Sequence, residues 1–241
     1  MVKPFRFPWN EFPDVLIHAE ELFVKKHPSY MAAKSGDVDA ASELVLASVN
    51  EDVLYQLQDQ FDEAEPPTLI SVHAEEAVGV NAIPEIMADF LSYILQWRIE
   101  RFVIQANVVN HTGANGFSRM AKQAVFEGEI APGKKYVIVD DFIGQGGTIE
   151  NLRGHILAGG GEVIGSTVLT GKSYSAILSQ QNKQLLELRE RHGQIEDWWK
   201  EHFGFGFDCL TESETRYLIK TPTSEKIRGS IQEYFEQNNQ V

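Results

Sequence analysis

Two adjacent carboxylates and a glycine-rich turn lie close together in the segment VIVDDFIGQGGTI, residues 137–149. A hydrophobic run leads into the acids, Asp140 and Asp141, and the turn that follows contains Gly144, Gln145, Gly146, Gly147 and Thr148. Glycines permit a tight turn in which backbone N–H groups converge on an anion, and a threonine hydroxyl at a helix N-terminus adds a donor. Carboxylates accept hydrogen bonds from hydroxyls. The segment therefore predicts a site for a sugar phosphate.

The pattern around this segment predicts an α/β fold with a mostly parallel sheet. Hydrophobic runs alternate with amphipathic helical patterns, which is typical of parallel strands with helices on both faces. The expected strands are 68–74, 101–109, 134–141 and 162–170, and the expected helices are 84–97 and 148–158. In such folds ligands bind at the carboxyl ends of the strands. We therefore expect Asp140 and Asp141 at that edge of the sheet.

Helical patterns flank this core on both sides. Between residues 14 and 62 apolar residues recur at helical spacing with no strand signal, and two prolines at 66 and 67 end the region. Helical patterns return from about residue 172, where Thr211 and Glu214 predict a capping box. We expect one globular unit with three parts: a helical N-terminal extension (1–65), an α/β core (66–171) and a helical C-terminal extension or hood (172–241).

The composition narrows the class of partner. The chain has 241 residues with 21 Lys and Arg against 35 Asp and Glu, a formal net charge of −14, which disfavours binding to nucleic acid. A single cysteine, Cys209, excludes an intrachain disulfide and fits a reducing compartment. No stretch approaches the ~20 apolar residues that span a bilayer. We expect a soluble, cytoplasmic protein without a nucleic-acid or membrane partner.

The acidic and glycine-rich segment resembles the ribose-phosphate signature of type I phosphoribosyltransferases, which is a hydrophobic strand, two acids, three variable residues and Thr-Gly-x-Thr. Asp140 and Asp141 match the acids, and the end of the turn matches at Gly146, Gly147 and Thr148. Gln145 departs from the threonine or serine of most members, although the xanthine enzymes carry an amide there and a phenylalanine after the acids. Gly144 departs from the hypoxanthine-guanine enzymes, which place an aspartate there.

Two other interpretations of the segment compete with this resemblance. One is a glycine-rich loop that binds no ligand, and the other is a Rossmann-type site such as that of a methyltransferase. A Rossmann dinucleotide site places its glycines directly after the first strand and its acid ~20 residues later. The order found here, acids first and glycines next, favours the phosphoribosyltransferase fold.

The resemblance implies two further parts of the site. A pyrophosphate-binding loop is expected after the first core strand, at Ala74, Glu75, Glu76 and Ala77. The two glutamates there either face Mg²⁺, directly or through water, or form a solvated acidic pair. A mobile loop is expected over residues 110–135, where Arg119 or Lys122 would stabilise departing pyrophosphate. The alternative for Arg119 is a solvated helix residue.

Aromatic residues gather in the C-terminal part of the chain. Trp198 and Trp199 could stack a nucleobase, or they could pack in the core as most aromatic residues do. Cys209 has no histidine nearby in sequence, which favours a packed thiol over a nucleophile.

The function implied by the resemblance is binding of 5-phosphoribosyl 1-pyrophosphate with Mg²⁺ and transfer of the phosphoribosyl group to or from a nucleobase-like heterocyclic acceptor. Asp140, Asp141 and Arg119 are then the expected catalytic residues, with the acids on hydroxyls rather than as direct metal ligands. A homodimer is expected. The alternative is a non-catalytic protein of the same fold that senses a phosphoribosyl ligand and regulates a partner.

Overall fold

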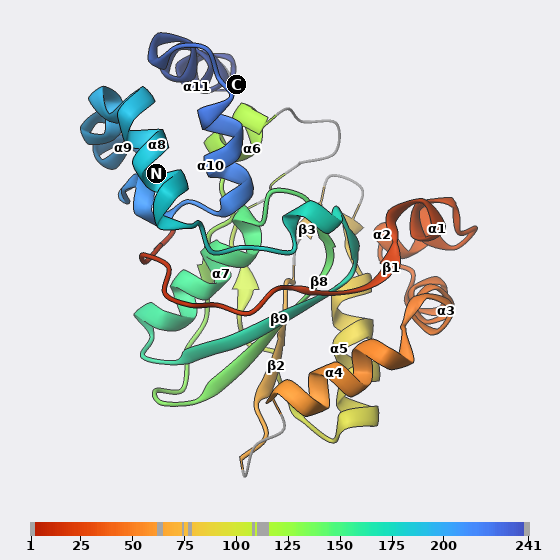
Figure 1. Cartoon of the computed structure of the whole chain (residues 1–241). Coiled ribbons are helices and arrows are strands. Elements are labelled where there is room, and N and C mark those ends of the chain that lie inside the picture. Colours follow the sequence, from red (N-terminus) through yellow and green to blue (C-terminus); the bar gives the residue numbers. More distant parts are fainter. Residues whose placement is uncertain are drawn as a thin grey trace.

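A computed structural model describes residues 3–61, 65–73, 75–76, 79–107, 109 and 116–238. Its centre is a parallel sheet with the strand order β1-β9-β8-β2-β5 (Figure 1). The strands are β1 (Leu16–Glu20), β9 (Glu162–Gly171), β8 (Lys135–Ile143), β2 (Thr68–Ser71) and β5 (Arg98–Glu100). This arrangement confirms the expected α/β class.

Both faces of the sheet are buried, because successive side chains of a strand point to opposite faces. On β8, Val137 and Val139 face a core that also contains Leu44, Leu57 and Leu91. Ile138 faces the other core, together with Leu152. The helices that supply these cores are α3 (Val38–Ser48), α4 (Glu51–Phe61) and α5 (Ile83–Leu95) on one face and α7 (Gly147–Ala158) on the other. The runs of hydrophobic residues in the strands follow from this double burial.

A third core holds the C-terminal helices together. They are α8 (Asn182–His192), α9 (Glu196–Phe203), α10 (Glu212–Ile219) and α11 (Ser224–Asn238), and the short α6 (Gly116–Ala121) packs with them. In Figure 1 this group lies at one end of the molecule, and the N-terminal segment starts beside it before running to β1. The capping box predicted at the start of α10 is confirmed, since Thr211 Oγ1 accepts from the Glu214 N–H at 3.1 Å.

The expectation that residues 14–62 are helical throughout is wrong at its beginning. Leu16–Glu20 form the strand β1, which pairs in parallel with β9. Side chains of β9 reinforce the pairing, since Thr167 Oγ1 donates to the Leu16 carbonyl at 2.9 Å and Thr170 Oγ1 to the Ala19 carbonyl at 2.7 Å. Pairing with a free sheet edge outweighs the local helical pattern of so short a segment. The remainder is helical, with α1 (Glu21–Lys26), α2 (Tyr30–Lys34), α3 and α4.

The expected strand at 101–109 is also misplaced. The segment that pairs with β2 is β5, at residues 98–100, and the chain then leaves the main sheet. It forms β6 (Ile104–Gln105), which pairs with β7 (Phe126–Glu127) in a separate antiparallel pair. Another small pair joins β3 (Glu75–Glu76) to β4 (Gly79–Val80). Within the described residues no helix combines the length and the apolar character needed to cross a bilayer.

Candidate functional site

A cavity of about 410 Å³ lies at the carboxyl end of β8. Its lining comes from distant parts of the chain: the acids and the glycine-rich turn, helix α6 and the N-terminal helices. The lining residues that carry charge are Arg6, Lys25, Lys34, Arg119, Asp140, Asp141 and Glu214. The structure thus brings the predicted acids, turn and cation into one cavity.

The two acids are buried beside each other. Asp140 is 5% exposed and Asp141 8% exposed, and Oδ1 of Asp140 accepts the Asp141 N–H at 2.8 Å. Burial and the neighbouring Asp141 charge raise the pKa of Asp140 well above its usual value, although Lys34 partly opposes the shift. At this edge of the sheet Asp140 therefore holds its proton more readily than an exposed carboxyl does.

Lys34 at the end of α2 neutralises the second acid. Its Nζ lies 3.0 Å from Oδ2 of Asp141, and both side chains are largely buried. Sequence reasoning missed this residue, because Lys34 lies 107 positions from Asp141. The pairing of β1 explains the approach: β1 is parallel to β9 and β8, so the chain after β1 emerges at the edge where the acids lie.

The glycine-rich turn is packed tightly by the C-terminal part of the chain. Gly146 has a φ of +81°, and a Cβ there would lie 2.4 Å from Cδ2 of Leu178. The turn is also held by hydrogen bonds, since Thr211 Oγ1 donates to the Gln145 carbonyl at 2.6 Å and Ser175 Oγ to the Gly144 carbonyl at 2.5 Å. Helix α7 begins at the next residue, so the N-terminus of a 12-residue helix faces the same cavity.

Arg119 lies against the first glycine of the turn. A Cβ on Gly144 would be only 2.6 Å from Nη1 of Arg119, so any side chain at 144 would displace the guanidinium. Lys122 is not among the described residues that line the cavity, whereas Arg119 is. Of the two candidate cations, Arg119 is the one that the fold brings to the turn.

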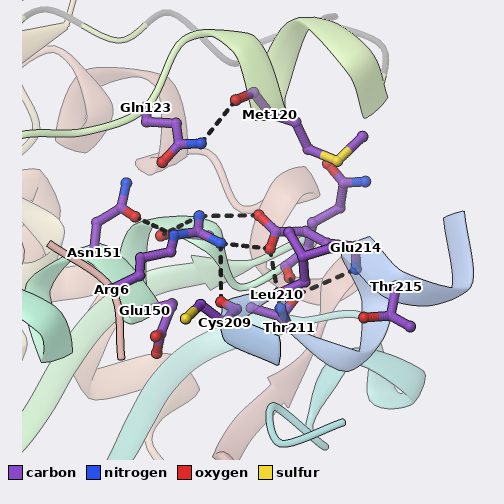
Figure 2. A network of polar contacts seen from close by, with 12 residues as sticks. Arg6, Met120, Gln123, Glu150, Asn151, Cys209, Leu210, Thr211, Glu214 and Thr215 are labelled. Atoms are coloured by element: carbon purple, nitrogen blue, oxygen red, sulfur yellow. Dashed lines mark hydrogen bonds and ion pairs between the residues drawn. The ribbon is translucent and has the colours of Figure 1, made fainter. Parts of the chain in front are cut away.

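Arg6 forms a buried ion pair with Glu214 (Figure 2), and both side chains also line the cavity. Nη1 of Arg6 lies 2.6 Å from Oε2 of Glu214, and Nε donates to Oδ1 of Asn151 at 2.6 Å. Burial lowers the pKa of Arg6, but the charge and hydrogen bonds of Glu214 outweigh burial and leave the pKa above its usual value. A Cβ on Gly147 would lie 2.7 Å from Oε1 of Glu214 and 3.1 Å from Nη2 of Arg6. The pair therefore sets the space available at the start of α7.

Two amide side chains at the cavity have an unused oxygen. Oε1 of Gln123 and Oε1 of Gln145 are buried without a hydrogen-bond partner among the described residues, and both side chains line the cavity. A buried polar atom without a partner is unfavourable by about 1–3 kcal/mol. Ligand hydroxyl or N–H groups would satisfy these atoms.

Residues 47–208 match the model of the phosphoribosyl transferase domain, which is well over half of the chain. The chain belongs to this family. It is 38% identical over 227 residues to protein TraN of Escherichia coli, covering 94% of this chain and 50% of TraN. It is 36% identical over 153 residues to an uncharacterized protein of Haemophilus influenzae, covering 63% of this chain and 34% of that protein. The chain thus spans half or less of the length of these relatives.

Solved phosphoribosyltransferase structures resemble the chain more distantly. Adenine phosphoribosyltransferase from Rhodothermus marinus aligns with 20% identity and a TM-score of 0.37, covering 55% of this chain and 73% of that one. The enzyme from Saccharomyces cerevisiae aligns with 14% identity and a TM-score of 0.36, covering 63% of this chain and 74% of that one.

Trp198, Trp199 and Cys209, which were also singled out from the sequence, are not among the described residues that line the cavity. Trp199 is fully buried in the core of the C-terminal helices, 4.3 Å in ring-centroid distance from Phe203, and Trp198 packs on the same core. Neither lines the cavity, and core packing is confirmed for Trp199. Cys209 is buried, and burial raises the pKa of its thiol to about 12, as expected for a packed thiol.

The expected pyrophosphate loop is only partly within the described residues. Ala74 and Ala77 lie outside them, and of Glu75 and Glu76 only the backbone, in β3, is described. Within the described residues, no group of three or more His, Cys, Asp or Glu side chains is arranged to hold a metal ion.

Proposed function

We propose that the chain binds 5-phosphoribosyl 1-pyrophosphate together with Mg²⁺ and transfers the phosphoribosyl group to or from a heterocyclic acceptor. The observation that carries the proposal is the single cavity shared by two buried acids at the end of β8 and a glycine-rich turn at the N-terminus of α7. One end of this cavity suits hydroxyls and the other suits a phosphate.

The turn would hold the 5′-phosphate. Backbone N–H groups of residues 144–148 and the Thr148 hydroxyl are donors, and the positive end of α7 adds favourable electrostatic potential. Such a site needs no net positive charge of its own. The packing of Leu178 and Thr211 on the turn supports the role, because it fixes the backbone before a ligand arrives.

The acids would bind the ribose hydroxyls. Asp141 accepts hydrogen bonds while Lys34 balances its charge, and a protonated Asp140, favoured by its raised pKa, can both donate and accept. The unused Oε1 of Gln145 supplies a further acceptor at the same cavity. The acids thus orient the sugar instead of attacking it.

The residues present fit a magnesium ion that arrives with its ligand. Mg²⁺ in proteins is commonly held by one or two carboxylates plus substrate phosphates and water, and not by an all-protein cage. Asp141 would contact the ion through water, in keeping with the preference of Mg²⁺ for oxygen ligands, and the bound ion would neutralise charge on the pyrophosphate.

The transfer itself exchanges one bond at the anomeric carbon. A ring-nitrogen lone pair of the acceptor forms a bond to C1′, and the C1′–O bond to pyrophosphate breaks with its electron pair leaving on pyrophosphate. Where that nitrogen carries a proton, the proton passes to solvent. Arg119, beside the turn, would stabilise the leaving anion. We assign the donor site mainly to the core, residues 66–171, with Arg6 and Lys34 reaching it from the N-terminal segment, and the acceptor site to the region where the flanks meet the core.

The test is calorimetric titration of the chain with 5-phosphoribosyl 1-pyrophosphate and Mg²⁺, followed by pyrophosphate release across a panel of heterocycles. We expect Asp141→Asn to weaken donor binding by about 10- to 100-fold, the effect of losing a hydrogen bond to a charged group. Asp197→Asn, which changes a side chain that is 97% exposed, should leave the affinity unchanged. If the wild-type chain binds the donor without turnover and Asp141→Asn loses that binding, the result favours a non-catalytic sensor of the same fold. No donor binding by the wild-type chain would refute the proposal.

A further inference from the structure

A groove rich in positive charge adjoins the candidate site. It measures about 770 Å³, and one acid, Glu21, is among its lining residues. Five cationic side chains line it: Lys25, Arg119, Lys172, Arg216 and Lys220. In the whole chain acidic residues outnumber basic ones by 35 to 21, so the charge of this groove is opposite to the net charge of the chain. A cleft lined by one sign of charge concentrates ligands of the opposite sign.

The groove stays positive after its ion pairs are counted. Glu21 contacts both Lys25 and Lys172, and these hydrogen bonds lower the pKa of Glu21. Arg216 pairs at 2.8 Å with Glu212, which does not line the groove. Setting Arg119 aside, two carboxylates face the other four cations, which leaves an excess of two positive charges among the described lining residues.

Aromatic rings lie among these cations. Nζ of Lys25 is 4.4 Å from the ring centroid of Phe142, and Cζ of Arg216 is 5.1 Å from that of Tyr174. Tyr174 is 59% exposed, although it is a large aromatic side chain. Cationic groups and exposed aromatic surface together suit a planar, negatively charged ligand.

The groove is continuous with the cavity of the candidate site. Phe142, Gly144 and Gln145, which directly follow the acids, line both. Lys172 follows β9 and Glu21 follows β1, so the groove lies on the β9 and β1 side of β8. A ligand in the groove is therefore adjacent to a sugar held by the acids.

We propose that this groove binds the acceptor and selects a heterocycle that carries a carboxylate or phosphate group. The inference rests on the proposed transfer, in which an acceptor ring nitrogen bonds to C1′ as pyrophosphate leaves with the electron pair. An N–H acceptor then releases its proton to solvent, and a pyridine acceptor becomes a pyridinium with no proton to release. The acid group of the acceptor takes no part in bond making. It binds Lys172, Lys220 and their neighbours and so directs the ring toward the sugar.

Matched pairs of heterocycles test the proposal: nicotinate against nicotinamide, and uracil-6-carboxylate against uracil. Each is titrated calorimetrically into the chain with saturating ribose 5-phosphate and Mg²⁺. We expect the acid of at least one pair to bind roughly tenfold tighter than its neutral partner, and the preference to shrink as salt is raised. Equal affinity within both pairs, or no binding of either acid, overturns the proposal.

A charge-neutral double variant, Lys172→Gln with Lys220→Gln, should abolish the preference for the acid. Lys183→Gln, an exposed cation on α8 outside the groove, is the control and should keep it. Affinity for 5-phosphoribosyl 1-pyrophosphate is measured for the same variants. A fall in donor affinity in the double variant would assign the groove to pyrophosphate and overturn the acceptor assignment. No donor binding by the wild-type chain would instead refute the proposed function on which the inference rests.

Discussion

The ammonium group of Lys34 lies 3.0 Å from Oδ2 of Asp141, so a helix of the N-terminal segment neutralises an acid of the central sheet. The contact joins α2 to the end of β8 and places the pair inside the candidate cavity. Two adjacent buried carboxylates without a cation would repel each other. Lys34 is therefore part of what allows Asp140 and Asp141 to share one site.

Replacing Lys34 should destabilise the fold through Asp141. We expect Lys34→Met to lower the free energy of unfolding by about 2 kcal/mol at neutral pH, because a buried carboxylate loses its ionic partner. Urea unfolding measures the change. In an Asp141→Asn background the same substitution should have a clearly smaller effect, and equal effects in both backgrounds would show that the ion pair contributes nothing.

The pair of Arg6 and Glu214 should be more sensitive than the pair of Lys34 and Asp141. Their side chains are 1% and 3% exposed, so Arg6→Met leaves an unpaired buried carboxylate and should lower the unfolding free energy by about 3–5 kcal/mol. The double variant Arg6→Met with Glu214→Leu should recover part of that loss. Chemical denaturation of the four proteins gives the coupling energy, and strict additivity would contradict the expectation.

Acid should destabilise the protein through His18 on β1. This side chain is 4% exposed, and burial lowers its pKa to about 4. The Asn50 N–H donates to its Nδ1 at 3.1 Å, a contact that requires the unprotonated nitrogen. Between pH 6.5 and 4 the unfolded chain binds a proton that the folded chain does not, so stability falls as pH decreases through this range. The loss reaches up to about 3 kcal/mol.

The His18 contribution is isolated by a difference measurement. Urea unfolding of the wild type and of His18→Gln is followed at several values between pH 4 and pH 7.5. The wild type should lose stability relative to the variant below about pH 6.5. Parallel curves for the two proteins would show that His18 does not titrate differently on folding.

A methyl group on the turn should impair ligand binding more than stability. Gly146→Ala combines a positive φ with a Cβ only 2.4 Å from Cδ2 of Leu178 and should displace the turn. Gly133→Ala is the matched control, because its φ is +73° and nothing lies within 4 Å of its Cβ. Backbone strain should destabilise both variants by about 1 kcal/mol, and the contact with Leu178 adds to this loss in Gly146→Ala. Only Gly146→Ala should also weaken binding of 5-phosphoribosyl 1-pyrophosphate in calorimetry. If the two variants bind it with equal affinity, the turn does not hold the phosphate.

The parts of the site that lie close together in sequence could be predicted, and those that meet only in the fold could not. Asp140, Asp141 and the turn follow one another in sequence, so the hydrophobic run before them predicts their shared position at the end of a strand. Arg6 and Lys34 carry no motif, and each reaches the cavity through contacts with residues more than 100 positions away. The cation Arg119 was predicted from its place in the loop before β8, and the structure puts it at the turn.

The two errors in the predicted strands have a common physical cause. Leu16–Glu20 is five residues long and has no strong alternation, so its strand conformation depends on the free edge of β9. The segment 98–100 is shorter still, with three residues, and among the described strands it pairs with β2 alone. The long strands β8 and β9, with strongly hydrophobic residues buried on both faces, were predicted to within two residues.

The ion pair of Arg6 and Glu214 has a consequence for the newly synthesised chain. The two residues are 208 positions apart, so the guanidinium emerges from the ribosome long before its carboxylate has been translated. The core strands and α7 are complete by then, but the start of α7 lacks the pair that packs against it. The start of α7 therefore reaches its final packing only after α10 has been made, and contacts of such long range slow folding. The glycine-rich turn therefore takes its final form only after the C-terminal part of the chain has packed on it.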